Sequence, residues 1–343
     1  MAKIFFDLEG PISSQDNAYD VLGVVKNGKR LFEVISKYDD ILTLEGRENY
    51  EPGDTLKLIV PFLIHNKISE CDINKVSKRA GVVPGVKAVI SRLMSDGWEV
   101  YIISTSYEQH AYNIARQIGV DNGRVACTKM PLNDYLLKFS DDDLEVVADM
   151  EEKILNELHP ELDERRIVAE LDKFFFETLP ESRLGNIFKD ITVVGGQSKV
   201  DAMMRFAGDG DLTSAVAVGD SITDFKMLDK VRNDGGLAIA FNGNEYSIPH
   251  ADVAVASIDQ RFLLPITSAF EEDGREGAIS AVERLENAPL DAILKAMPQD
   301  IASTIPGDIT QPQYHRINSN TAPIIEIHRK YRTLLRGDAG KLG

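Results

Sequence analysis

The chain has 343 residues, of which 43% are hydrophobic and 27% charged, and its formal net charge is −17. This composition is typical of a globular protein with more than one structural unit. An acidic surface repels phosphodiester backbones, so we expect no nucleic-acid partner. The two cysteines, Cys71 and Cys127, have neither disulfide-framework nor zinc-site spacing, which is typical of a reducing compartment.

Membrane and export signals are not predicted. No uninterrupted apolar stretch approaches the roughly 18 residues of a membrane helix. The first residues, Met-Ala-Lys-Ile-Phe-Phe-Asp, do not have the layout of a signal peptide. We therefore expect a cytoplasmic protein without a membrane partner.

The first predicted element is a short buried strand over residues 3–6, which is apolar and aromatic. It runs directly into Asp7, Leu8 and Glu9, and the turn residues Gly10 and Pro11 end it. The two carboxylates therefore lie at the carboxyl end of the strand, where open α/β sheets bind their ligands. Two acids held this close require a cation or a shared proton.

Residues 12–83 are mostly helical and polar in pattern, with a strongly apolar stretch at 54–65 and a short helix at 69–80. A helix at 87–96 and a strand at 98–103 follow, and the strand ends in Ser104, Thr105 and Ser106. The next predicted elements are a helix at 108–118 and a short strand at 125–128.

The stretch 132–190 is predicted to be entirely helical, and its Phe174-Phe175-Phe176 run is interpreted as packing. Residues 191–196 suggest a short strand or sheet edge, and Lys199 begins a helix at 199–206. Further strands are predicted at 214–218, 237–241 and 252–256, the first followed by Gly-Asp-Ser-Ile-Thr-Asp (219–224) and a helix at 225–231. Strands that alternate with helices indicate a Rossmann-like, doubly wound parallel sheet.

The C-terminal part is predicted to be helical from 259 to about 296, loosely ordered over 297–322, and to end in a basic helix over 323–336. The expected organisation is an α/β core, a helical cap, a second helical insertion and a C-terminal extension. Their respective bounds are 1–12 plus 84–131 plus 191–258 for the core, 13–83 for the cap, 132–190 for the insertion and 259–343 for the extension and tail.

Polar side chains gather at the strand ends and helix starts of this predicted sheet. They are Asp7 and Glu9, then Ser104, then Lys199, and finally Asp220 and Asp224. The set suits phosphoryl transfer, in which a carboxylate attacks phosphorus and a second carboxylic acid moves a proton. Mg²⁺ and an ammonium would neutralise the charge on the phosphate.

These motifs resemble the haloacid dehalogenase superfamily of phosphatases and phosphotransferases. The resemblance rests on Asp7-Leu8-Glu9-Gly10, Ser104, Lys199 and the stretch 219–224, and it covers roughly residues 1–258. The sequence is most similar to the phosphoserine phosphatase group, whose homoserine phosphotransferase-like members also carry Asp-Leu-Glu-Gly. That family inserts a helical cap where residues 13–83 lie.

The resemblance implies a role for each matching residue. Asp7 is the nucleophile and a Mg²⁺ ligand, and Glu9 is the general acid/base with its backbone carbonyl on the metal. Ser104 binds the phosphoryl group, with Thr105 beside it, and Lys199 neutralises phosphate and Asp7.

In the same resemblance, Asp220 binds Mg²⁺, and Asp224 supports the metal shell or Lys199. Asp16 occupies the place of an acid that reads the substrate amine. The expected substrate is a small phosphorylated metabolite.

Several alternatives stay open at this level. The second acid of the first motif is usually Asp, and Glu9 leaves open whether the acceptor is water or another molecule. The insertion 132–190 and the tail after 258 have no counterpart in small phosphoserine phosphatases, and either suits a protein partner. A catalytically weak, regulatory protein is therefore one rival, and dehalogenase-type carbon chemistry on the same nucleophile is another. Arg30 and Arg47 are expected at surface positions rather than on the substrate.

Overall fold

The computed structural model describes residues 1–48, 50–161, 163–185, 187–208, 210–337 and 340. Its strands form one sheet in the order β3-β2-β1-β4-β5-β6-β7. Their bounds are β1 (Lys3–Phe6), β2 (Glu99–Tyr107), β3 (Val125–Thr128), β4 (Ala215–Gly219), β5 (Leu237–Phe241), β6 (Val253–Ala256) and β7 (Gln313–Arg316). All neighbouring pairs from β3 to β6 are parallel, and β7 joins β6 antiparallel.

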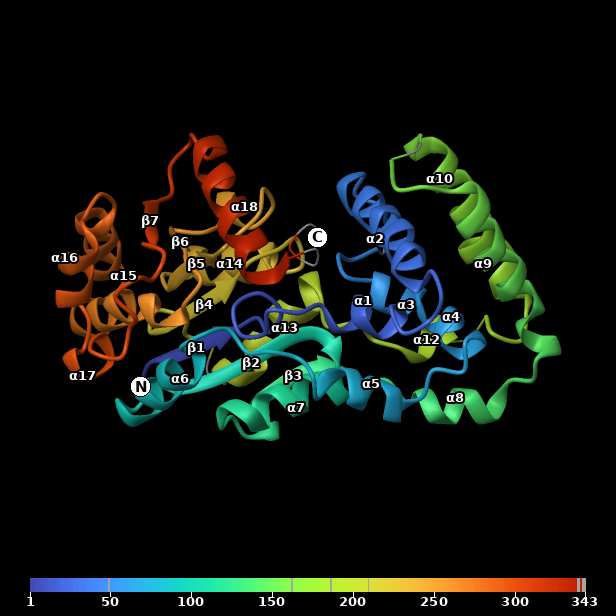
Figure 1. Cartoon of the computed structure of the whole chain (residues 1–343), viewed down its shortest axis with the longest axis horizontal. Coiled ribbons are helices and arrows are strands. Elements are labelled where there is room, and N and C mark those ends of the chain that lie inside the picture. Colours follow the sequence, from blue (N-terminus) through green and yellow to red (C-terminus); the bar gives the residue numbers. More distant parts are fainter. Residues whose placement is uncertain (49, 162, 186, 209, 338–339, 341–343) are drawn as a thin grey trace.

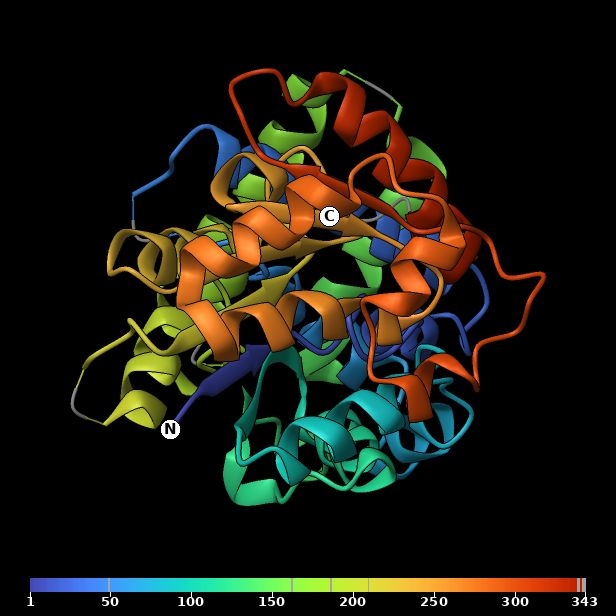
Figure 2. The ribbon, with the colours of Figure 1, turned by 90° about the vertical axis from the view of Figure 1, so that its left-hand side faces the viewer.

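Helices cover both faces of this sheet, because alternate side chains of each strand point to opposite sides. Phe6 belongs to the apolar cluster of one face and Phe5 to that of the other. Figure 2 views the core end-on, with the teal α6 and α7 at the bottom and the red α18 at the top. The first face carries α6 (Val86–Ser95), α7 (Glu108–Ile118), α15 (Leu264–Leu285, interrupted at Gly274), α16 (Leu290–Lys295) and α17 (Gln299–Ala302), and the second carries α13 (Gly196–Ala207), α14 (Phe225–Asn233) and α18 (Ala322–Arg336). The predicted doubly wound α/β sheet is confirmed.

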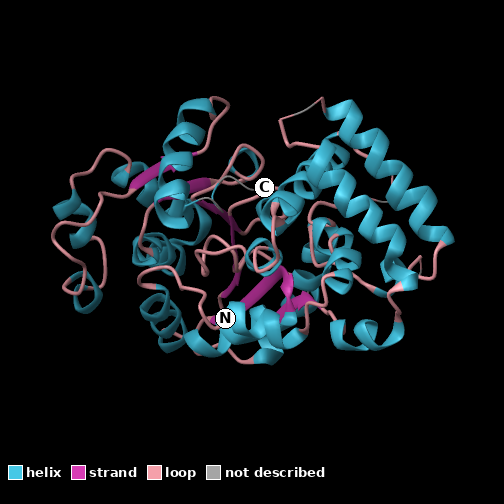
Figure 3. Cartoon of the chain, turned by 45° about the vertical axis from the view of Figure 1, so that its right-hand side comes forward, coloured by secondary structure: helices cyan, strands magenta, loops and turns pink. Residues whose placement is uncertain are grey.

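The two helical segments predicted at 13–83 and 132–190 lie together on the other half of the molecule (Figures 1 and 3). Their helices are α1 (Asn17–Leu22), α2 (Gly28–Leu44), α3 (Thr55–Leu58), α4 (Val60–His65), α5 (Glu70–Ser77), α8 (Leu132–Lys138), α9 (Glu145–Glu157), α10 (Glu164–Asp172), α11 (Leu179–Glu181) and α12 (Ile187–Asp190), with a π-helix η3 (Lys173–Thr178) between α10 and α11. The remaining short turns are η1 (Asn122–Arg124), η2 (Asp142–Leu144), η4 (Ile248–His250) and η5 (Gln260–Leu263).

A single apolar core joins these two segments into one helical lobe. Tyr38 stacks on Phe175 with ring centroids 5.8 Å apart, and Phe62 lies 5.9 Å from Phe174. Polar contacts reinforce the joint, since both nitrogens of the Arg47 fork donate to Asp172, at 2.5 and 2.9 Å. The cap and the insertion are therefore expected to be stable only as a pair.

Arg30 also links the two segments, because its guanidinium donates to the carbonyl of Leu158 at 3.0 Å. Arg30 and Arg47 are half-buried structural residues, which explains why neither lines the pocket described below.

Two local predictions are wrong. Residues 191–194 do not pair as a strand, and the Val194 N–H instead donates to the Thr128 hydroxyl at 3.1 Å. The stretch 297–322 contains α17 and β7 rather than only loosely ordered chain. Strand β7 is polar in sequence, but Tyr314 is buried and donates its hydroxyl to the carbonyl of Phe262 at 2.8 Å.

The predicted basic C-terminal helix is confirmed as α18. Its Ile324 packs in the apolar cluster of Ala240, Ile248 and Ala254, and the Gly243 N–H donates to His328 Nδ1 at 3.1 Å. Helix α18 is thus fixed to the sheet and ends toward the helical lobe (Figure 1). Within the described residues, none of the helices combines the length and apolar character that crossing a bilayer requires.

The shared aromatic core predicts that Phe175→Ala lowers the free energy of unfolding by about 3–5 kcal/mol, because the large side chain is buried and leaves a cavity. Phe176→Ala is the matched control, because the adjacent ring is 50% exposed. It is expected to cost less than about 1 kcal/mol. Chemical denaturation measures both changes, and equal losses would contradict the shared core.

Candidate active site

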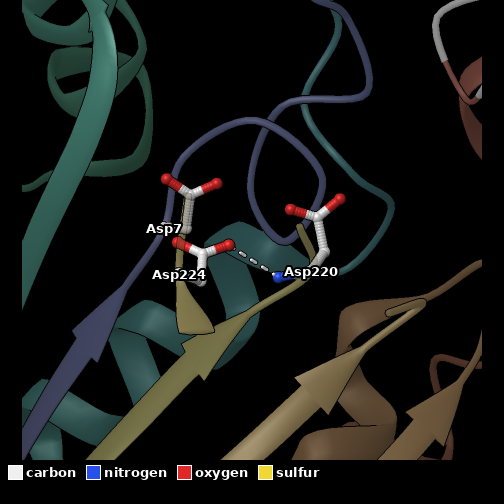
Figure 4. A group of neighbouring side chains, drawn as sticks. All are labelled: Asp7, Asp220 and Asp224. Atoms are coloured by element: carbon white, nitrogen blue, oxygen red, sulfur yellow. Dashed lines mark hydrogen bonds between the residues drawn. The ribbon is translucent and has the colours of Figure 1, made fainter. Parts of the chain in front are cut away.

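The candidate site lies where the chain direction across the sheet reverses. The chain passes from β1 to β2 and β3 on one side, and β4 then pairs with the other side of β1. Such a switch point leaves a crevice at the carboxyl ends of the two central strands. Asp7 follows β1 and Asp220 follows β4, so their carboxylates lie close together at this crevice (Figure 4).

Two glycines allow this close approach. Gly10 has φ of 118°, and a Cβ at this position would lie 2.3 Å from the Asp220 carboxylate. A Cβ on Gly219 would lie 2.6 Å from Cβ of Asp224. Glycine is therefore required at position 10 by the positive φ and the lack of space, and at position 219 by the lack of space.

A buried ion-pair network holds the centre of the site. Lys199 Nζ donates to Asp7 Oδ1 at 2.5 Å and to Asp224 Oδ1 at 2.7 Å, and none of the three side chains is more than 6% exposed. Burial and the nearby Asp224 raise the pKa of Asp7 to about 7, although Lys199 opposes this. Burial lowers the pKa of Lys199, but Asp224 and Asp7 together hold it above its ordinary value. The ammonium therefore stays charged between two carboxylates.

Asp224 organises the loop that carries Asp220. Its Oδ2 accepts the backbone N–H groups of Asp220 and Ser221 at 2.9 and 3.0 Å (the first is the dashed line in Figure 4). Its Oδ1 is the partner of Lys199. Both oxygens of Asp224 are thus already engaged within the protein.

The carboxylates present a donor set that fits a hard divalent cation. Oxygen atoms of Asp7, Asp220 and Asp224 lie within 4.8 Å of one another, and all three residues are buried. Asp220 Oδ1 is buried and has no hydrogen-bond partner in the part of the chain that the structure describes. A buried, unpaired carboxylate oxygen costs free energy unless a cation or donor meets it. Mg²⁺ prefers oxygen ligands of this kind.

A cavity of about 90 Å³ opens above this centre. Of the residues predicted from the sequence, Asp7, Glu9, Asp16 and Thr105 line it, whereas Lys199, Asp220 and Asp224 lie buried beside them. Helix α2 of the helical lobe supplies lining residues on the opposite side that the sequence analysis did not identify, namely Phe32, Ser36, Asp39 and Asp40.

Strand β2 continues past the predicted end at Ile103 to Tyr107, so Ser104 and Thr105 lie in its irregular last part, and their hydroxyls differ in position. Ser104 is 1% exposed and does not line the cavity, and its Oγ accepts the Ser106 N–H at 3.1 Å. Thr105 does line the cavity, and its Oγ1 lacks a partner among the described residues. Thr105 is therefore better placed than Ser104 to donate to a ligand.

Glu9 and Asp16 form the acidic wall next to Asp7. Glu9 Oε1 accepts the Asn17 N–H at 2.8 Å, and Asp16 caps α1 by accepting the Tyr19 N–H at 2.9 Å. Burial and the nearby Asp16 raise the pKa of Glu9 to about 8. This shift favours the protonated form of Glu9 near neutral pH, the form in which a carboxyl group can donate a proton.

Two arginines that the sequence analysis did not assign to the site reach it from α18. Arg332 donates to both the carbonyl and Oδ2 of Asp220, and Arg336 donates to the same Oδ2 at 3.0 Å. Both arginines line the cavity. Their i,i+4 spacing places them on one face of a helix, but the sequence alone does not show where that face docks.

The buried network predicts that Lys199→Met lowers the free energy of unfolding by about 3–5 kcal/mol, because it leaves two buried carboxylates without their cation. The measurement is chemical denaturation in EDTA, so that no divalent cation replaces the ammonium. Lys226→Met is the control, because Lys226 pairs with Glu51 at a partly exposed position. Its expected cost is about 0–1 kcal/mol, and a similar cost for Lys199→Met would contradict the network.

Comparisons with known proteins place the chain in a family. No protein-family model and no curated protein matches it. Among solved structures, gene product AF1437 from Archaeoglobus fulgidus is 30% identical, with a TM-score of 0.81, over 100% of this chain and 99% of that one. The match therefore includes the segments 132–190 and 259–343.

Two more distant matches are phosphoserine phosphatase in its apo form, at 16% identity, and a phospho-aspartyl intermediate analogue of phosphoserine phosphatase, at 18%. Each covers 77% of this chain and 97% of the other, with a TM-score of 0.48. The sheet order and the position of the site at its switch point agree with the α/β fold that the motifs predict. The chain belongs to the same family as the AF1437 gene product from Archaeoglobus fulgidus.

Proposed function

We propose that this protein is a Mg²⁺-dependent phosphatase or phosphotransferase that acts on a small phosphorylated metabolite through an aspartyl-phosphate on Asp7. One observation carries the proposal. Lys199 is buried between Asp7 and Asp224, next to an Asp220 oxygen that is open to a cation. A purely structural strand end needs neither a buried ammonium nor an unpaired carboxylate oxygen.

In the first step, a carboxylate oxygen of Asp7 attacks phosphorus, and the bond from phosphorus to the leaving oxygen breaks. The leaving oxygen takes the proton of Glu9, whose raised pKa keeps it protonated in the resting enzyme. Lys199 neutralises Asp7 and the incoming phosphoryl oxygens, because its ammonium is already within hydrogen-bond distance of Asp7.

In the second step, ionised Glu9 takes a proton from water or from another acceptor hydroxyl, and that oxygen attacks phosphorus. The bond between Asp7 and phosphorus breaks, so Asp7 and protonated Glu9 are regenerated. Glu9 has a longer side chain than the usual Asp, and this changes its reach. Experiment therefore decides whether the acceptor is water or another hydroxyl.

The residues proposed to hold Mg²⁺ are Asp7, Asp220 and the backbone carbonyl of Glu9. Asp224 is proposed to act through Lys199 and the Asp220 loop, because both of its oxygens are engaged there. When bound, the cation supplies positive charge that offsets the negative charge of the phosphoryl group.

The cavity favours a small substrate with a cationic group. On the side of the cavity that the helical lobe forms, the lining residues include the acids Asp16, Asp39 and Asp40 and the ring of Phe32. An amine near the phosphate would offset these charges, in line with the role proposed for Asp16. Both oxygens of Asp39 are engaged, by Tyr50 and by the Gly53 N–H, so Asp40 is the better candidate on α2, together with Asp16, whose bond to the Tyr19 N–H uses Oδ1.

Thr105 is proposed as the hydroxyl that binds the phosphoryl group. Thr105→Val keeps the shape of the side chain and removes one hydrogen bond, so kcat/KM is expected to fall about five- to tenfold. Ser104→Ala is expected to change kcat/KM less than about twofold, because its hydroxyl serves the local turn. A larger loss for Ser104→Ala than for Thr105→Val would reverse the assignment.

The mechanism predicts phosphate release that needs both Mg²⁺ and Asp7. We would test a panel containing phosphoserine, phosphohomoserine, sugar phosphates and p-nitrophenyl phosphate. Asp7→Asn is expected to lower the rate at least about a thousandfold, and EDTA is expected to abolish release until Mg²⁺ is restored.

The control for Asp7→Asn is Asp96→Asn, which changes an acid paired with Arg92 on the surface and is expected to keep wild-type activity. Full activity of Asp7→Asn on every substrate would refute the mechanism. If the protein is folded and binds Mg²⁺ but releases phosphate from none of the substrates, the result would favour a dedicated phosphotransferase or the regulatory alternative.

A further inference from the structure

The C-terminal helix α18 reaches into the centre of the molecule. Arg332 and Arg336, one helical turn apart near its end, both donate to Oδ2 of Asp220. Their side chains are only 4% and 5% exposed, although both line the cavity. The helix is held by its apolar contacts and by the His328 bond to Gly243, so the arginines are presented from a fixed element.

The charges around the cavity indicate that these arginines can attract an anionic ligand. Among the described lining residues, the acids are Asp7, Glu9, Asp16, Asp39 and Asp40, and the cations are Arg332 and Arg336. An anionic substrate that enters this cavity is repelled by those acids that are ionised. The guanidinium groups are the lining side chains that can attract it before it reaches Lys199 beneath Asp7.

Arg336 retains donor capacity for such a ligand. Its Nη1 bonds to Asp220, while its Nε is buried and has no partner within the described part of the chain. A buried guanidinium donor without an acceptor is costly unless a ligand supplies one. The planar fork of arginine also suits the geometry of carboxylate and phosphate oxygens.

The arginines do not obstruct the predicted cation site. The bonds that the two arginines make to the Asp220 carboxylate end on Oδ2, and Oδ1 is the oxygen without a partner among the described residues. Arg332 also holds the Asp220 carbonyl at 3.1 Å, which fixes the orientation of that carboxylate. The arrangement leaves Oδ1 directed to a cation and places a guanidinium on the other side.

We propose that α18 is part of the active site, with Arg336 as a residue that binds an oxyanion of the substrate and Arg332 as the positioning residue of Asp220. The oxyanion is either the phosphoryl group itself or a second anionic group close to it, such as a carboxylate. The kinetic test of this proposal rests on the proposed function. The binding test does not, because it measures the affinity for a ligand without any reaction.

The test compares wild type, Arg336→Ala and Arg336→Lys with the matched control Arg329→Ala. Arg329 is an exposed arginine of the same helix, paired with Glu326. Two readouts are used: kcat/KM for phosphoserine and p-nitrophenyl phosphate, and calorimetric titration with inorganic phosphate in the presence of Mg²⁺. Asp220 keeps Arg332 as its partner in these variants, so folding is expected to survive, and thermal unfolding checks it.

Arg336→Ala is expected to lower kcat/KM about tenfold to a hundredfold, as expected for the loss of a charge-assisted hydrogen bond. Arg336→Lys is expected to recover part of this loss, and Arg329→Ala to match wild type. Losses on both substrates, with weaker binding of inorganic phosphate, assign Arg336 to the phosphoryl group. A loss confined to phosphoserine assigns it to the second anion.

Wild-type values for Arg336→Ala in every assay would overturn the proposal. Higher activity and tighter Mg²⁺ binding in this variant would also overturn it, because α18 would then act as an inhibitory segment. If wild type binds inorganic phosphate through Arg336 but releases none from any substrate, the proposed function fails and the binding role stands. If wild type is active and Arg336→Ala equals it, the binding role alone fails.

Discussion

The structure of the site depends on one buried ammonium. Lys199 lies between Asp7 and Asp224 with no exposed side-chain surface. Burying charged groups costs several kcal/mol per ion unless each has a partner. The cation therefore makes a cluster of acids tolerable in the interior and allows Asp7 to remain close to ionisation at neutral pH. The same contact that stabilises the fold also holds the carboxylate that we propose as the nucleophile.

The sheet topology brings the carboxylates of the site close to this ammonium. Asp7 and Asp220 leave adjacent parallel strands at the switch point, and Gly10 lets the turn after Asp7 pass against the Asp220 carboxylate. Asp224 then uses one oxygen for Lys199 and the other for the backbone of the Asp220 loop. The three acids thus differ in the hydrogen-bond partners that they hold.

Two elements far apart in the sequence enclose this centre. Helix α2 brings an aromatic ring and two acids over the cavity, and α18 brings two arginines from the end of the chain. The helical lobe behind α2 draws its core from both 13–83 and 132–190. The AF1437 gene product matches this chain over nearly its whole length, so the additional segments belong to the shared architecture.

Local sequence patterns were sufficient to predict the α/β sheet, its strands β1 to β6, the acids at the strand ends and the lysine at the start of α13, because buried strands and helix starts leave local patterns. Local patterns do not predict that Thr105 rather than Ser104 faces the cavity, since the direction of a side chain in the irregular last part of β2 depends on the neighbouring segments of the chain. The edge strand β7 has no local apolar pattern and forms by pairing with β6. Likewise, 323–336 read as a basic helix, but its docking, which carries Arg332 and Arg336 to Asp220, comes from contacts across more than 100 residues of sequence.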